Sequence, residues 1–159
     1  MTPEVEKEVE ISFRRTQLIM IASGVAMLAF LALNYFLAQN ARPSANSDYG
    51  MLRVSFTVIV AFLCFGSIIL RRYMFREMKL HTILTGGGIK AMLDHLSRTS
   101  IILAAITEAA AIMGLVFGVT TGDMWFAADL ILVGFLVFIV SFPRRSSWLR
   151  AAAYAEQNG

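Results

Sequence analysis

The chain has 159 residues, of which 57% are hydrophobic and 16% are charged, and its mean hydropathy is +0.66. Soluble domains are about half apolar and about a quarter charged, so this composition excludes an ordinary soluble domain. The formal net charge of +3 is explained by the basic residues that flank apolar blocks, and it requires no nucleic-acid partner.

Four apolar blocks are long enough to be membrane helices, because a helix needs about 20 residues to cross the hydrocarbon core. They cover residues 16–38, 51–70, 99–121 and 124–142. Within lipid, each span must satisfy its own backbone hydrogen bonds, as a helix does. We therefore predict an all-α integral membrane protein, a four-helix bundle that forms one membrane domain over residues 1–159 with the lipid bilayer as its surroundings.

The basic residues predict the orientation of these spans. Twelve of the 14 Lys and Arg residues lie before the first span, between the second and third spans, or after the fourth span. Basic residues are enriched in cytoplasmic segments, so we expect a multi-pass protein of the inner membrane with both termini cytoplasmic. Trp125 and Trp148 lie close to predicted span ends, where tryptophan is typical of the membrane interface.

Residues 71–98 are too polar to span a membrane and too apolar to be a free linker. One helical face recurs at spacings of three and four residues, at Ile89, Met92, Leu93 and Leu96. Helix-breaking glycines precede this face, at Gly86, Gly87 and Gly88. We predict that the second span extends to about Leu84, turns at the glycines and returns, which forms a cytoplasmic helical hairpin between helices 2 and 3.

The sequence gives no indication of an enzyme, a cofactor or a metal site. It contains no nucleophile paired with a base and no cofactor fingerprint, and its one cysteine, Cys64, lies inside a span. Asp94 and His95 are adjacent and point to different sides of a helix. His81 belongs to the other arm of the predicted hairpin, so these three residues do not form a ligand set.

Two acids lie inside predicted spans, where an ionised carboxylate costs about 3 kcal/mol. At about 1.5 Å per residue, Glu108 is roughly 13 Å from the inner end of its span, whereas Asp129 is about 9 Å from the outer end of its own. Their depths differ by about 11 Å, too far for a direct pair. Glu108 has no basic residue at its depth, which favours its protonated form.

Two interpretations of Glu108 remain open. In the first, a small oligomeric protein binds a proton or a cation at Glu108, with Asp129, Asn34 and Thr107 as secondary candidates for the site. In the second, Glu108 is a hydrogen-bonding residue that holds helices together in a structural or assembly subunit that does not transport. A line of small residues on the third span predicts close helix packing, at Ala110, Gly114 and Gly118. A homo-oligomer or a place in a larger membrane complex would fit this line.

The stretch EAAAIMGLV, residues 108–116, resembles the carboxylate helix of rotary ATP synthase c subunits. The resemblance implies that Glu108 is the ion-binding carboxylate, on a helix that follows a polar cytoplasmic segment. It covers one helix and is not a full-length match. The second span has a single glycine, Gly66, where the inner helix of that family has a ladder of glycines.

Overall fold

The computed structural model describes residues 2–40, 49–74 and 77–158. Within these ranges the chain forms helices and no strands, so the prediction of an all-α fold is confirmed. The helices are α1 (Pro3–Asn40), α2 (Gly50–Met74), α3 (Glu77–Thr121), α4 (Met124–Ser141) and α5 (Arg145–Asn158).

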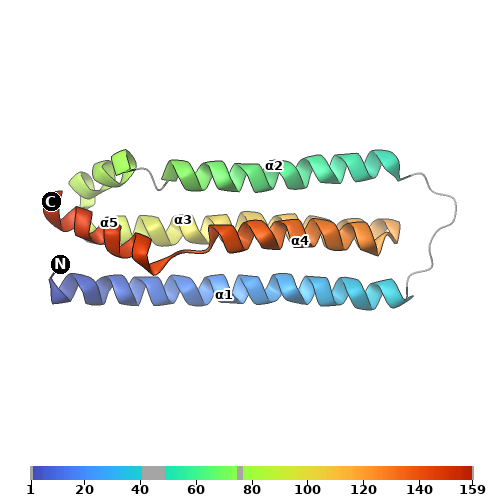
Figure 1. Ribbon diagram of the computed structural model, residues 1–159, viewed down its shortest axis with the longest axis horizontal. Coiled ribbons are helices and arrows are strands. Elements are labelled where there is room, and N and C mark those ends of the chain that lie inside the picture. The colour runs from blue at the N-terminus through green and yellow to red at the C-terminus, as the bar shows by residue number, and fades with distance from the viewer. Residues whose placement is uncertain (1, 41–48, 75–76, 159) are drawn as a thin grey trace.

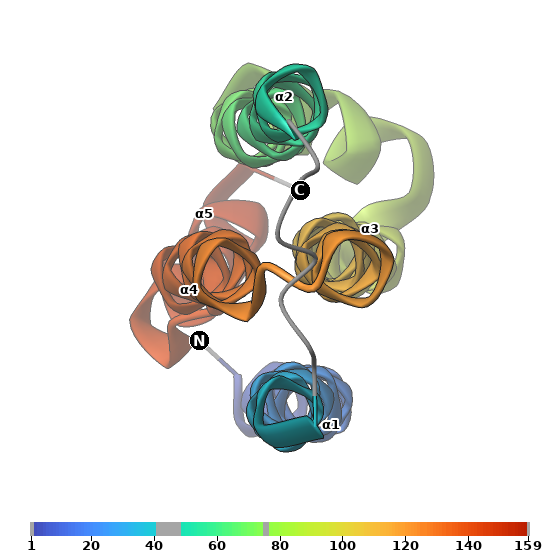
Figure 2. The same ribbon diagram turned by 90° about the vertical axis from the view of Figure 1, so that its right-hand side faces the viewer.

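The four long helices lie side by side along one axis (Figure 1). Viewed from the end, α3 and α4 occupy the middle, with α1 on one side and α2 on the other (Figure 2). Each predicted span corresponds to one of these helices, and the described residues contain four helices that are long and apolar enough to cross a membrane. Both termini lie at one end of the bundle, which we call the terminal end; the other is the far end.

The helices extend well beyond the predicted spans at the terminal end. α1 begins at Pro3, a residue that suits the first turn of a helix. α2 is described as far as Met74, and a helical segment over residues 77–87 opens α3. Residues 75–76 between them lie outside the described residues, so the continuation of the second span to Leu84 stays a prediction. α3 is broken at Gly88, whose φ of 68° and ψ of −170° are essentially restricted to glycine.

Two apolar cores fill the middle of the bundle, and α3 and α4 contribute to both. The core on the α1 side contains Met20, Met27, Ala104, Ala111, Ile131 and Phe138. The core on the α2 side contains Val60, Cys64, Ala110, Phe117, Ala127 and Leu130. The turn between α3 and α4 is formed by Gly122 and Asp123, so the two helices are antiparallel neighbours.

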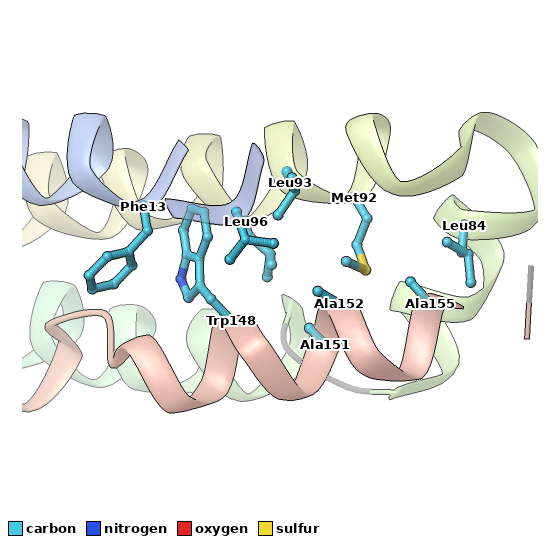
Figure 3. Close-up of a cluster of buried hydrophobic side chains, with 10 residues drawn as sticks. Phe13, Leu84, Met92, Leu93, Leu96, Trp148, Ala151, Ala152 and Ala155 are labelled. Carbon is cyan, nitrogen blue, oxygen red and sulfur yellow. The ribbon is translucent and has the colours of Figure 1, made fainter. Parts of the chain in front are cut away.

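A third core, the terminal core, joins the start of α1, the first part of α3 and α5 (Figure 3). It consists of Val9, Phe13, Leu84, Met92, Leu93, Leu96, Trp148, Ala151, Ala152 and Ala155. Trp148 is 0% exposed, so its predicted place at the membrane interface is wrong. The indole instead packs against Phe13, because the apolar face of α5 is covered by protein. Trp125 is 87% exposed.

Candidate functional site

α1 and α3 run in the same direction, and two polar contacts fix how they align. Near the terminal end, the hydroxyl groups of Thr16 and Ser97 share a hydrogen bond of 2.8 Å. Near the far end, Asn34 lies so close to Gly118 that a Cβ added there would be 2.8 Å from the Asn34 side-chain oxygen. Glu108 therefore lies about midway between these two contacts along α3.

Glu108 is half-buried, next to the closely packed part of α3. Ala104 and Ala111, on its own side of the helix, belong to the core shared with α1. The neighbouring Thr107 is buried, and its hydroxyl donates to the carbonyl oxygens of Leu103 and Ala104 at 3.1 and 2.9 Å. Thr107 is thus satisfied by its own helix, and no described residue donates a hydrogen bond to the Glu108 carboxyl.

Asn34 is buried, with 3% of its surface exposed, and it joins α1 to the start of α4. Its side-chain amide donates to the carbonyl oxygen of Met124 at 2.8 Å. Its Oδ1 atom is buried and has no hydrogen-bond partner among the described residues. Because Gly118, beside Asn34, is ten residues from Glu108, the two side chains lie about 15 Å apart along α3. The structure does not bring Asn34 and Glu108 into one site.

Asp129 is also separate from Glu108. Gly134 of α4 packs on the α3 backbone beside Glu108, since a Cβ added to it would be 3.1 Å from the carbonyl oxygen of Thr107. Asp129 is five residues nearer the far end, about 7–8 Å along α4, and its side chain is exposed. Asn34 and Asp129 therefore lie at other levels of the bundle than Glu108, and the adjacent Thr107 hydroxyl donates within its own helix.

The line formed by Ala110, Gly114 and Gly118 faces α4 of the same chain. A Cβ added to Gly114 would be 2.8 Å from the Cγ1 atom of Ile131 and 3.0 Å from the carbonyl oxygen of Ala127. Ala110 is 0% exposed. These small residues let the two helix backbones approach each other closely. Because α4 covers the line, it is not a surface that a second copy of the chain can use.

Ion pairs at both ends of the bundle were not predicted from the sequence. At the far end, Arg53 forms a 2.6 Å ion pair with Asp123 and lies over the ring of Phe126. At the terminal end, Glu10 accepts from Arg14 at 2.9 Å and from Arg145 at 3.1 Å. Hydrogen bonding by Arg14 outweighs desolvation and, together with Arg145, lowers the pKa of Glu10. Only the Glu10–Arg14 spacing of four residues is visible in the sequence.

Among the described residues, no group of three or more His, Cys, Asp or Glu side chains is placed to hold a metal ion. Asp94 is exposed on α3. The side chain of His81 lies outside the described residues, and so does most of the far-end connection between α1 and α2.

Comparison of the chain with protein-family models, with curated proteins and with solved structures gives no match. The resemblance of residues 108–116 to the c-subunit helix is therefore neither supported nor contradicted by relatives.

Proposed function

We propose that this protein is a small oligomeric membrane protein in which Glu108 reversibly binds a proton or a cation. The observation that carries the proposal is a half-buried carboxyl, midway along a membrane-length helix, to which no described residue donates a hydrogen bond. An acid in hydrocarbon without a counter-ion takes up a proton or is neutralised by a bound cation. The resemblance of residues 108–116 to the c-subunit helix supports the same role.

The surroundings of Glu108 support access from the side of the bundle. The carboxyl lies on the flank of α3 and not in the α3–α4 contact, which Ala110 and Gly114 occupy. Ile112, one turn along, and Val116 are 41% and 45% exposed, so this flank continues into an open apolar face. A second copy that packs on this face would cover Glu108 and complete its site.

We place the protein in the inner membrane with the terminal end in the cytoplasm. Twelve of the 14 basic residues precede the first span, lie between the second and third spans or follow the fourth, and the enrichment of Lys and Arg in cytoplasmic segments supports this orientation. Residues 77–98 then form a cytoplasmic helical segment that turns at Gly88 and packs on α5 and the start of α1 through the terminal core.

The direct test is carbodiimide modification of the purified protein in detergent, read by peptide mass spectrometry across pH and sodium concentration. Ion binding predicts labelling of Glu108 that fades at alkaline pH or when sodium is added. Asp129→Asn is the matched control, because it removes the other acid of the spans from an exposed position. A Glu108 that never reacts, while Asp129 does, would contradict the proposal and favour the structural subunit.

Glu108→Gln separates the two functions independently. If Glu108 binds an ion, this variant assembles normally but loses the sodium- or pH-dependent change in thermal stability that the parent protein shows. If the acid only holds helices together, the parent protein shows no such dependence and the variant differs from it only in stability. The oligomer is measured on the same samples by native mass spectrometry.

A further inference from the structure

An apolar groove with a volume of about 510 Å³ runs between the middle of α1 and the last turns of α4. Its walls are Ile21, Gly24, Val25, Leu28, Phe135, Phe138, Ile139, Phe142 and Arg144. Eight of these nine residues have no polar side-chain atom, and the ninth is an arginine. The groove lies on the opposite side of the molecule from α2, which does not line it.

Gly24 and three aromatic rings shape the groove. A Cβ at Gly24 would be 3.1 Å from the ring of Phe138, so glycine lets α1 lie close to that ring, which forms the buried floor of the groove. Phe138 stacks with Phe135 at 6.3 Å and meets Phe142 edge to face at 6.0 Å. The result is a continuous aromatic wall along one side of α4, facing aliphatic residues of α1.

The groove has one polar end. Its lining spans residues 21–28 of α1 and 135–142 of α4, so it runs about 10 Å along the bundle. Arg144 closes it at the terminal end, two residues beyond the predicted span. An arginine in this position keeps its charge at the membrane interface while the groove continues into the hydrocarbon.

No acid lines the groove to neutralise Arg144. The acid of this region, Glu10, is bound by Arg14 and Arg145. Arg71 lies at the same end and donates to the carbonyl oxygen of Val140 on α4, so it adds positive charge near the end of this helix. Within the part of the chain that the structure describes, Arg144 is thus a cation without an acidic partner at one end of the apolar groove.

We propose that this groove binds an anionic phospholipid, with one acyl chain along Phe138 and Gly24 and the headgroup phosphate at Arg144. Basic pockets beside membrane helices bind anionic headgroups. The apolar walls fit a hydrocarbon chain, whereas a free phosphate would leave these walls uncovered. The lipid belongs to the leaflet at the terminal end. The inference rests on the groove and its charge, and it holds or fails independently of ion binding at Glu108.

The test uses the purified full chain in mild detergent with equal amounts of phosphatidylglycerol and phosphatidylcholine, and native mass spectrometry to count bound lipids. The parent protein should retain phosphatidylglycerol preferentially. Arg144→Gln should weaken this retention about fivefold, which is the contribution of one basic side chain near an anionic headgroup. Arg72→Gln, an exposed arginine of α2 outside the groove, is the matched control and should leave retention unchanged.

A second pair of variants tests the apolar part. Val25→Trp fills the groove, whereas Val58→Trp places the same side chain on α2, and both positions are surface-exposed, at 60% and 61%. Val25→Trp should reduce the retention of both lipids, and Val58→Trp should not. The proposal would be overturned if Arg144→Gln and Arg72→Gln lost bound phosphatidylglycerol equally, or if Val25→Trp retained its bound lipid in full. A Val25→Trp variant that loses dimers and keeps its lipid would instead identify the groove as a contact between copies.

Discussion

The ring of Trp148 meets the ring of Phe13 edge to face, with centroids 5.6 Å apart and an interplanar angle of 73°. This contact joins α5 to the start of α1 at one end of the terminal core (Figure 3). The core is therefore held together by segments from the two ends of the sequence, and its stability depends on a few large side chains.

Trp148→Ala should lower the free energy of unfolding by about 3–5 kcal/mol, because it leaves a large cavity in a fully buried site. Trp148→Phe should cost less, since the buried Nε1 atom has no hydrogen-bond partner among the described residues to lose. Thermal unfolding in detergent measures both. Trp125→Ala, at a position 87% exposed, serves as the control. Equal effects of the two alanine variants would contradict the burial of Trp148.

Asn34→Ala should destabilise the bundle by about 0.6–1.7 kcal/mol, the range measured for hydrogen bonds between membrane helices. The variant removes the bond to the carbonyl oxygen of Met124, which is 2.8 Å long. Gln39→Ala, on an exposed position of α1, is the matched control. Unfolding in mixed detergent micelles gives the difference. A loss of sodium-dependent stability in Asn34→Ala would show instead that Asn34 belongs to the ion site.

Gly114→Ala should destabilise the protein by about 1–3 kcal/mol, because its Cβ would meet the backbone of α4, which cannot move aside. The Ala127 carbonyl oxygen and the Ile131 nitrogen would both be 3.0 Å away. Gly66→Ala has nothing within 4 Å of its new Cβ. It should be neutral or stabilise α2 by up to about 1 kcal/mol. If both variants unfold at the same temperature, the close approach of α3 and α4 is wrong.

Glu10 should make stability depend on pH. Arg14 and Arg145 hold its pKa below the ordinary value of 4.5. A carboxyl with a lowered pKa stabilises the folded protein above pH 4.5, and this contribution is lost as the pH falls through the lowered value. Glu10→Gln should therefore melt at a lower temperature than the parent at pH 7. This difference in melting temperature should disappear as the pH falls below the lowered pKa of Glu10. Glu8→Gln, on an exposed position of the same helix, should show no such gap.

The sequence predicted the four long apolar helices because length and hydrophobicity of a block are local properties. Apolar blocks located α1 to α4 to within a few residues at the far end, for example at Thr121 and Met124. At the terminal end, the predicted spans are shorter than α1 and α3. α1 and α3 continue into a region where polar and apolar residues alternate on helical faces, and the end of an apolar block does not mark the end of such a helix.

The terminal core and the partners of the polar residues depend on tertiary packing, which a single sequence does not reveal. The spacing of Met92 and Leu96 predicts an apolar helix face, but it does not predict that α5 covers this face. Tryptophan near a span end tends to lie at the membrane interface, whereas the burial of Trp148 depends on Phe13, which is far away in the sequence. The small-residue line on α3 predicted a close neighbour without identifying it, and the structure shows that this neighbour is α4.

α1 is a single helix from Pro3 to Asn40, about 57 Å long at 1.5 Å per residue. It packs in the terminal core through Phe13, flanks the middle of α3 where Glu108 lies, and reaches Met124 through Asn34. One continuous helix therefore links the terminal core, the middle of α3 and the first turn of α4. Because the three contacts share one rigid element, α1 cannot shift along the bundle axis at one of them without shifting at the other two.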